Sequence, residues 1–276
     1  MAVIFSNTGL ADIYPRLCHD LLDGGSDVRP RGKLTKELLD VTIQIEDPAD
    51  VRLDAVNRAR YKPAIGVAEG LLLIAGVSDP ALMTRISPAF KAFTDGGAFH
   101  GAYGPRLRFQ LPRAIERLAA DRDTRQAVVT IWDPLHDGAE PEQDSPRDLP
   151  CTVYLNLRIR DGKLTLKTHM RSNDAWLGLP YDVTQFTLLQ RTIADVLGLP
   201  AGPYVHHVDS LHLYEGHWDS AEQTHAPTSG YPSLGGLTAA TWSQARLLAM
   251  ELLYEDLFWG EDTPEARLSV LINRYL

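Results

Sequence analysis

Apolar residues recur at helical spacing in five segments of the chain. A spacing of three and four residues between apolar positions predicts helices that bury one face, and it occurs at residues 11–25, 63–77, 111–123, 182–198 and 241–260. The second segment is almost entirely apolar and carries a single charged residue, Glu69. We therefore expect Glu69 to be largely buried.

Other segments have the composition of β-strands, because they are rich in β-branched and aromatic residues. They occupy residues 126–132, 151–160, 163–172 and 204–214. The dipeptide Asp161-Gly162 separates the second from the third and is typical of a tight hairpin turn. The sequence has no internal repeat and no low-complexity linker. This mixture predicts an α+β fold with one domain over residues 1–276.

Composition and charge exclude several classes of protein. The 276 residues carry a formal net charge of −9, and an acidic balance argues against a general nucleic-acid-binding protein. No apolar run reaches the roughly 18–20 residues of a membrane helix, and the N-terminal segment lacks the features of a signal peptide. The two cysteines, Cys18 and Cys151, form no disulfide framework. We expect a cytoplasmic protein without a metal cofactor.

Cys151 begins a series of motifs in the second half of the chain. A proline precedes it, and the later motifs are Arg171-Ser172-Asn173-Asp174, Gly178-Leu179-Pro180-Tyr181-Asp182 and Ser210-Leu211-His212-Leu213-Tyr214. A single cysteine at a strand start is most often a small buried apolar residue, and the local signature of papain-like hydrolases is missing. The set as a whole closely resembles thymidylate synthase, which has a Pro-Cys nucleophile, an Arg-Ser-x-Asp twenty residues later, a Gly-Leu-Pro-Phe-Asn and a His-x-Tyr.

The resemblance continues upstream and covers most of residues 25–220. Arg29 lies where the family has a phosphate-binding arginine, and Glu69 matches the family's catalytic glutamate. Tyr103 lies in a segment similar to the family's Tyr-Gly-containing segment. Arg125 resembles an arginine that one subunit donates to the active site of its partner. The resemblance implies a thymidylate synthase-like domain, with a mixed β-sheet covered by helices, and a homodimer joined through its sheets.

The resemblance also implies a mechanism on a pyrimidine nucleotide. C5 of a pyrimidine is a poor nucleophile, and addition of a thiolate at C6 makes C5 carbanion-like. Cys151 would be that nucleophile, with Arg171 lowering the pKa of its thiol. Glu69, with a pKa raised by burial, would transfer protons, and Tyr103 would help to remove the C5 proton. The implied one-carbon donor is 5,10-methylenetetrahydrofolate.

Binding roles follow from the same motifs. Arginine and hydroxyl side chains suit a phosphate, whereas the family's late His-x-Tyr binds the sugar hydroxyl and its aspartate holds the pterin. The implied phosphate-binding residues are Arg29, Arg125 of a partner, Arg171 and Ser172; Asn173 also belongs to the nucleotide site, His212 and Tyr214 bind the sugar, and Asp174 and Glu69 contact the folate.

Asp182 departs from thymidylate synthase, which uses asparagine there to read uracil. Cytosine presents the reverse hydrogen-bonding pattern, with an acceptor at N3 and a donor at N4, and a carboxyl group suits it. Asp182 and the surrounding motifs resemble bacteriophage deoxycytidylate hydroxymethylase and the cytidylate hydroxymethylases of nucleoside-antibiotic pathways. Ala175 stands where relatives often carry a larger residue, which would leave room for a ribose 2′-hydroxyl. The expected substrate is CMP or dCMP, with CMP preferred.

Two products and two classes of function stay open at this point. Addition of water to the methylene intermediate gives a hydroxymethyl group and tetrahydrofolate, whereas hydride transfer gives a methyl group and dihydrofolate. The chain ends in SVLINRYL, unlike the apolar tail that excludes water in the synthases. Hydroxymethyl transfer is therefore the expected reaction. The alternatives are a thymidylate or 5-methylcytidylate synthase, and a non-catalytic homologue that binds nucleotide or RNA.

Overall fold

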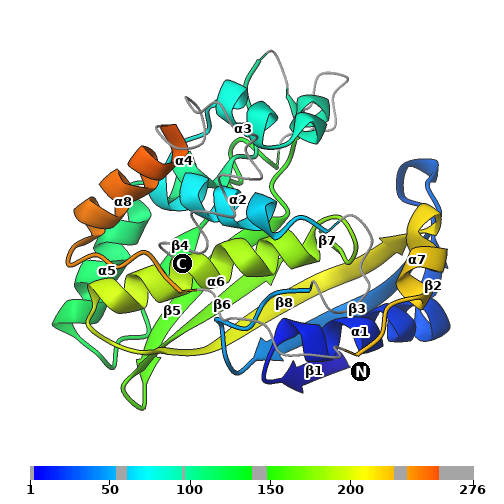
Figure 1. Ribbon diagram of the computed structural model, residues 1–276, viewed down its shortest axis with the longest axis horizontal. Coiled ribbons are helices and arrows are strands. Elements are labelled where there is room, and N and C mark those ends of the chain that lie inside the picture. Colours follow the sequence, from blue (N-terminus) through cyan, green and yellow to red (C-terminus); the bar gives the residue numbers. More distant parts are fainter. Residues whose placement is uncertain (1–2, 54–60, 95–96, 139–147, 227–234, 255–276) are drawn as a thin grey trace.

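The computed structural model describes residues 3–53, 61–94, 97–138, 148–226 and 235–254. Within these ranges the chain folds around one mixed β-sheet with helices packed against it, which confirms the predicted α+β class (Figure 1). No helix in the described ranges is both long enough and apolar enough to cross a bilayer.

The sheet follows the strand order β1-β3-β8-β6-β5-β4, with β2 added to β3 and β7 added to β8. β3 pairs in antiparallel fashion with β8, and β8 lies parallel to β6, its other neighbour. The strands are β1 (Val3–Asn7), β2 (Ser26–Val28), β3 (Thr35–Ile45), β4 (Val128–Thr130), β5 (Thr152–Arg160), β6 (Lys163–Met170), β7 (Asn173–Asp174) and β8 (Ala201–Tyr214).

Helix α6 connects the parallel strands β6 and β8 and lies along the sheet, with α2 stacked upon it (Figure 1). A parallel pair requires such a crossover, and a helix is its usual form. The helices are α1 (Leu10–Gly24), α2 (Pro63–Ala75), α3 (Pro80–Ile86), α4 (Tyr103–Leu107), α5 (Gln110–Ala120), α6 (Leu179–Val196), α7 (Trp218–Glu222) and α8 (Trp242–Glu251), and the short 3-10 turns are η1 (Pro30–Gly32), η2 (Pro88–Phe93) and η3 (Glu215–His217).

The five predicted helices correspond to α1, α2, α5, α6 and α8, and the four predicted strands to β4, β5, β6 and β8. The hairpin at Asp161-Gly162 is confirmed, since both residues have positive φ, 51° and 71°. The final predicted helix is observed as far as Glu251, and its last residues and the tail SVLINRYL lie outside the described ranges.

Strands β1 and β3 were not predicted from the sequence, although β3 is central to the sheet. The alternation of β3 breaks at Asp40, which has φ 54°. Val41, Ile43 and Ile45 are fully buried, but Leu39 is exposed. A residue in the left-handed region turns the following side chains to the other face. The strand therefore lacks the period of two by which a strand is recognised in a sequence.

Helix α6 is buried between the sheet and α2. It carries no charged residue between Asp182 and Arg191, and its buried threonines donate to carbonyls of the preceding turn. Gly66 and Gly70 of α2 allow the two helices to approach closely. A Cβ at Gly66 would lie 2.8 Å from Thr184, and one at Gly70 would lie 2.8 Å from Leu188. This contact brings Glu69 to the start of α6.

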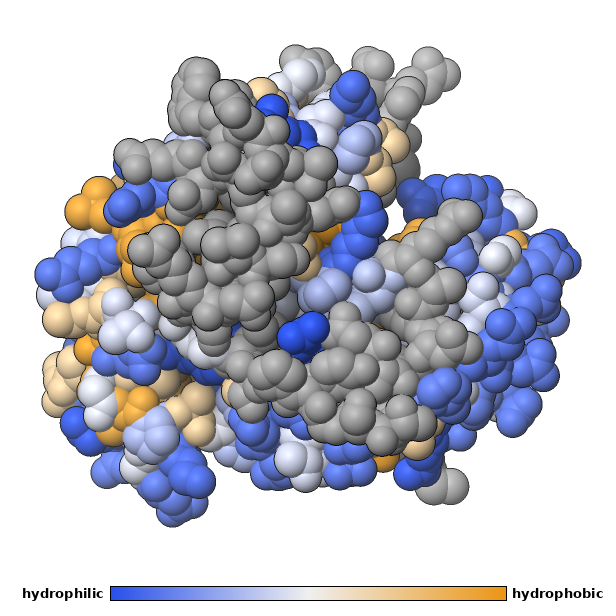
Figure 2. Space-filling view, in the orientation of Figure 1, coloured by the Kyte–Doolittle hydropathy of each residue, from blue (hydrophilic) through white to orange (hydrophobic). Residues whose placement is uncertain are grey.

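The surface is unevenly polar (Figure 2). Hydrophilic residues cover the end of the molecule formed by β2 and α7, and apolar residues are more frequent on the side where α5 and α8 lie. Exposed apolar side chains on that side include Leu247 of α8 and Phe109 at the start of α5.

Candidate active site

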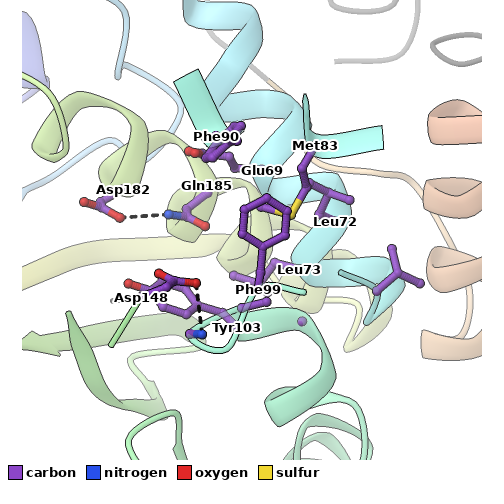
Figure 3. A pocket seen from close by; sticks show the side chains of 14 residues that line it. Glu69, Leu72, Leu73, Met83, Phe90, Phe99, Tyr103, Asp148, Asp182 and Gln185 are labelled. Carbon is purple, nitrogen blue, oxygen red and sulfur yellow. Dashed lines mark hydrogen bonds between the residues drawn. The ribbon is translucent and has the colours of Figure 1, made fainter. Parts of the chain in front are cut away.

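A cavity of about 220 Å³ opens between α2, η2, α4 and α6. It has a polar end and an apolar wall (Figure 3). The polar end contains Glu69, Tyr103, Asp148, Asp182 and Gln185, and the apolar wall includes Leu72, Leu73, Met83, Phe90 and Phe99. Phe90 and Phe99 meet edge to face, with ring centroids 6.2 Å apart. A flat molecule with one polar edge would fit this cavity.

Cys151 immediately precedes β5, and Arg171 holds the loop that carries it. The backbone N–H of Arg171 donates to the Cys151 carbonyl (2.9 Å), and its guanidinium donates to the carbonyls of Pro150 (3.0 Å) and Leu149 (3.3 Å). The guanidinium also lies over the ring of Trp132, 5.4 Å from the centroid. The position of the thiol therefore depends on the arginine that was predicted to bind phosphate.

The pKa of the Cys151 thiol is raised, mainly because the thiol is buried. Arg171 lowers this pKa as predicted, and Arg31 does so to a smaller extent, whereas Asp182 and Asp148 raise it. The net shift is nevertheless upward, because the two arginines do not offset burial and the two nearby carboxyl groups. Without ligand, the thiol is protonated at neutral pH.

Glu69 and Asp182 form a pair of carboxyl groups with raised pKa values. Burial raises the pKa of Glu69 to about 8, and the charge of Asp182 adds to the effect. Burial also raises the pKa of Asp182 to about 7. The predicted burial shift of Glu69 is confirmed in direction. Both groups titrate close to neutral pH, where groups that transfer protons are most effective.

Two neutral amides hold Asp182. The amide of Asn173 donates to Oδ2 and that of Gln185 to Oδ1, each over 2.8 Å. These bonds lower the pKa of the carboxyl group without offsetting its burial. Because amides carry no net charge, they do not hold the carboxyl group in its ionised form. The group can therefore gain or lose a proton near neutral pH.

A chain of buried side chains fixes the orientation of Asn173. Its Oδ1 lies 2.9 Å from Nε2 of His206, and Nδ1 of His206 lies 2.8 Å from the hydroxyl of Tyr204. Burial lowers the pKa of His206 to about 3, so the imidazole is neutral. With Nε2 protonated, it donates to Asn173, and the Asn173 amide must then point its N–H towards Asp182. Asn173 is only 3% exposed, and its side-chain amide lies between His206 and Asp182.

Tyr103 lies between the cavity and Cys151. Its hydroxyl accepts a hydrogen bond from the N–H of Thr152 (3.3 Å), and its ring stacks on Phe186 with centroids 6.1 Å apart. Burial raises the pKa of Tyr103. The phenol is therefore neutral and can donate a proton to, or share one with, a base next to the thiol.

The remaining predicted residues differ in how near they lie to the cavity. Asp174 uses Oδ1 to accept from the N–H groups of Trp176 and Leu177 (2.7 and 2.9 Å), and its charge raises the pKa of Asp182. The rings of His212 and Tyr214 lie 5.2 Å apart at the end of β8, where His212 pairs with Asp174. These three residues thus occupy one region, at the place where β7 pairs with the end of β8.

Ala175 does not agree with the role expected for it. It is fully buried, and its carbonyl accepts from the hydroxyl of Tyr14 (2.9 Å). Its methyl group does not border open space, so the argument for a ribose 2′-hydroxyl loses its basis. Arg29 and Arg125 are exposed, and Ser172 is partly buried.

Three residues near the site were not predicted from the sequence. Gln185 lies one helical turn after Asp182 on α6, and that spacing was a usable signal. Arg31, with φ 52°, is the arginine of its segment that lowers the pKa of Cys151. Asp148 accepts from the N–H of Gly101 (3.0 Å), and it had no signal beyond its nearness to Cys151 in the chain.

Comparison with known proteins agrees with this geometry. The thymidylate synthase family model matches residues 99–239, and the chain belongs to that family. It is 33% identical over 227 residues to the deoxyuridylate hydroxymethyltransferase of Bacillus phage SP01, which covers 76% of this chain and 58% of the relative. It is 31% identical over 259 residues to the enzyme of the same name from Delftia phage PhiW-14, with 87% of this chain and 72% of the relative covered. The chain thus spans a little over half the length of the SP01 relative.

Proposed function

We propose that the chain is a pyrimidine nucleotide 5-hydroxymethyltransferase that uses 5,10-methylenetetrahydrofolate. The observation that carries the proposal is the convergence of Glu69, Tyr103 and Asp182 on one cavity, close enough to Cys151 for Asp182 to influence the thiol pKa. A nucleophile, two proton-transferring groups and a group that reads the base are the parts this reaction needs. The names of both relatives support hydroxymethyl transfer.

In the proposed mechanism the Cys151 sulfur adds to C6 of the base. Approach of the nucleotide phosphate to Arg171 leaves less positive charge for the thiolate, so the thiol proton must pass to a nearby base. Tyr103 and Glu69 are placed to move protons, including the one lost from C5. The apolar wall of the cavity fits the flat aromatic parts of the folate, with Glu69 and Asp174 towards its polar ring. The folate supplies the one-carbon unit, and water completes the hydroxymethyl group.

Asp182 supports cytosine as the base. A protonated carboxyl group donates to N3 of cytosine and accepts from N4. Once the sulfur has added at C6, N3 becomes more basic and takes that proton. The ionised Asp182 then faces two donors, whereas the corresponding uracil adduct would place a negative O4 against the carboxylate. Stabilisation of the adduct rather than of the bound substrate favours turnover of cytidylate. We propose CMP or dCMP as the substrate.

Deoxyuridylate is the second candidate, because both relatives are named for it. The test is a comparison of CMP, dCMP, UMP and dUMP with methylenetetrahydrofolate, with products identified by mass spectrometry. A gain of one hydroxymethyl group on a cytosine nucleotide supports the proposal. The same product on dUMP alone would replace cytidylate by deoxyuridylate. A methyl product with a rise in dihydrofolate absorbance would show a synthase, and no product with any of the four would favour a binding protein.

Cys151 is tested by release of tritium from C5 of the substrate. Cys151→Ala is expected to abolish release, because no other group adds at C6. Cys18→Ala is the matched control, since Cys18 is buried in α1 away from the cavity. Retained release in Cys151→Ala would overturn the mechanism.

Arg125 supports the proposal of a homodimer joined through its sheets. It is exposed just before β4, as an arginine donated to a partner must be. Arg125→Ala and Cys151→Ala subunits, each inactive, are expected to regain activity when mixed, because one of the two sites in the mixed dimer is intact. If labelled subunits exchange and activity stays absent, Arg125 is not donated across the interface.

A further inference from the structure

A third carboxyl group, that of Asp148, lines the polar end of the cavity together with those of Glu69 and Asp182. Asp148 and Asp182 enter this end from opposite sides in Figure 3. No step of the proposed mechanism yet uses Asp148. The step that still lacks a proton acceptor is the addition of water to the methylene intermediate, because water has to lose a proton when it becomes the hydroxyl group of the product.

The carboxyl group of Asp148 is held in place from both sides. Its Oδ2 accepts a hydrogen bond from the N–H of Gly101 over 3.0 Å (Figure 3). The two segments meet so closely that a Cβ at Gly101 would lie 2.6 Å from the carbonyl oxygen of Asp148. The guanidinium of Arg171 holds the carbonyls of the next two residues, Leu149 and Pro150. The carboxyl group therefore has a fixed place at the cavity, three residues before the proposed nucleophile.

The other acidic groups at this end are unsuited to accept a proton from water. Burial raises the pKa of Glu69 to about 8 and also raises the pKa of Tyr103, so both side chains are protonated at neutral pH. Asp182 is engaged with N3 of the base in the proposed mechanism. Asp148 differs from these three, because it is only partly buried and its negative charge acts on the thiol of Cys151. Among the described residues that line the cavity, it is the carboxylate suited to act as a general base.

We propose, on the basis of the hydroxymethyl transfer proposed above, that Asp148 is a catalytic residue that takes a proton from the water that adds to the methylene intermediate. The water oxygen bonds to the methylene carbon, and the π pair of that carbon moves to the C4–C5 bond. The proton passes to the carboxylate of Asp148 and from there to solvent. The S–C6 bond then breaks with its pair on the Cys151 sulfur, the C5=C6 bond forms again, and N3 returns its proton to Asp182. The sulfur recovers the proton that it lost on addition, so the net change is the addition of one water molecule.

The test compares release of tritium from C5 with formation of product in single turnovers, with the chain in excess over a C5-tritiated nucleotide. The nucleotide is whichever of CMP, dCMP, UMP and dUMP gives a hydroxymethyl product. Asp148→Asn keeps an oxygen that accepts from Gly101 and removes only the charge. Because the C5–H bond breaks before water adds, we expect tritium release at the rate of the unmodified chain and product formation that is about a hundredfold slower. Asp148→Glu retains a carboxylate and is expected to recover part of the rate of product formation.

A trapping experiment identifies the step independently. 2-Mercaptoethanol is partly ionised near neutral pH and needs no general base to add to the methylene carbon. The thioether product is expected to be about tenfold or more abundant in Asp148→Asn than in the unmodified chain, because the methylene intermediate persists for longer. Asp133→Asn is the matched control, since the carboxyl group of Asp133 contacts His136 over 2.7 Å and does not line the cavity. It is expected to leave tritium release, product and trapping unchanged.

The outcomes separate this assignment from the proposed function. If the unmodified chain gives neither tritium release nor a hydroxymethyl product, the proposed function is wrong and the role of Asp148 with it. If the unmodified chain is active, equal losses of release and product in Asp148→Asn would place Asp148 before the water step or in the support of the fold. Unchanged product formation would show that another group is the base, and either result overturns the assignment. If Asp148→Asn does not retain the circular dichroism of the unmodified chain, Asp148→Ser, which also offers an acceptor to Gly101, is used in its place.

Discussion

Asp182, which lines the cavity, and Asp137, which does not, are two carboxyl groups with opposite electrostatic settings. The side chain of Asp137 is fully buried and binds the guanidinium of Arg106, with His100 2.8 Å away and the N–H of Asp133 also donating over 2.8 Å. Its pKa is lowered to about 2, although its burial acts to raise it. Asp182 is held by two neutral amides, and its pKa is raised to about 7.

The comparison separates a carboxylate that supports the fold from one that is available for chemistry. Arg106 belongs to α4, the helix that begins at Tyr103, so Asp137 anchors that helix to the loop after β4. A cationic partner makes the charge of Asp137 permanent and its position fixed. Neutral partners leave Asp182 able to gain or lose a proton near neutral pH, which is the property that its proposed base-reading role requires.

The largest expected effect is on stability and distinguishes the two groups. Asp137→Asn leaves Arg106 without its anionic partner and is expected to lower the free energy of unfolding by about 3–5 kcal/mol at neutral pH. Asp182→Asn is expected to be neutral or stabilising there, because it removes a buried group that ionises at a cost. Urea denaturation of both variants measures this. Equal losses would show that Asp182 is also structural.

The second prediction concerns base choice. Asp182→Asn is expected to move the kcat/KM ratio of cytidylate to uridylate by about ten- to a hundredfold towards uridylate, because each mismatched buried hydrogen bond costs about 1–3 kcal/mol. Gln185 can turn its amide to accept from the new N–H, whereas Asn173 is held by His206. An unchanged ratio, or a preference for uridylate in the unmodified chain, would contradict the proposed role of Asp182.

The third prediction is the pH dependence of the two carboxyl groups. The stabilising effect of Asp137 is present above pH 4 and is lost as pH falls towards 2, because its folded pKa lies below its unfolded value. The raised pKa of Asp182 acts in the opposite direction, so the chain loses stability as pH rises from about 4 to about 7. Asp182→Asn is expected to reduce this second slope and leave the first, and the part that remains is due to Glu69, whose pKa is also raised. Unfolding free energies measured from pH 3 to 8 test both signs.

The activity is expected to depend on the protonation of Asp182. With cytidylate, kcat/KM is expected to fall as pH rises through about 7, when Asp182 loses the proton that it shares with N3. In Asp182→Asn, assayed with uridylate, this fall should be absent, and only titration of Glu69 near pH 8 should remain. A fall through pH 7 that persists in the variant would assign it to another group.

The smallest expected effect tests the chain that orients Asn173. His206→Phe removes the donor to Asn173, so the amide can turn and the cytidylate-to-uridylate ratio is expected to relax by about tenfold or less. His206→Gln retains a donor and is expected to restore part of the ratio. His207→Phe makes the same change on the opposite face of the sheet and is expected to leave the ratio unchanged. Equal effects of the two phenylalanine variants would indicate a general loss of stability.

Much of the fold was predictable because local patterns carry it. The apolar run of α2, the alternating runs of β5 and β6 and the turn at Asp161-Gly162 each express one local preference. The central strand β3 was not predictable in this way, since Asp40 interrupts its alternation. Its place in the sheet depends on pairing with β8, which lies far along the chain.

The sequence by itself determined the family and the burial of Glu69, and it singled out Cys151 as the proposed nucleophile, since these depend on motifs and on the composition of one helix. Only the tertiary structure decided the protonation of the site. The pKa of Cys151 is raised mainly because folding buries the thiol, and the charge of Asp182, which comes from a distant segment, adds to the effect. The difference between Asp137 and Asp182 depends on whether folding brings a guanidinium or an amide to each carboxyl group, and a charge interacts through space with whatever the fold places beside it.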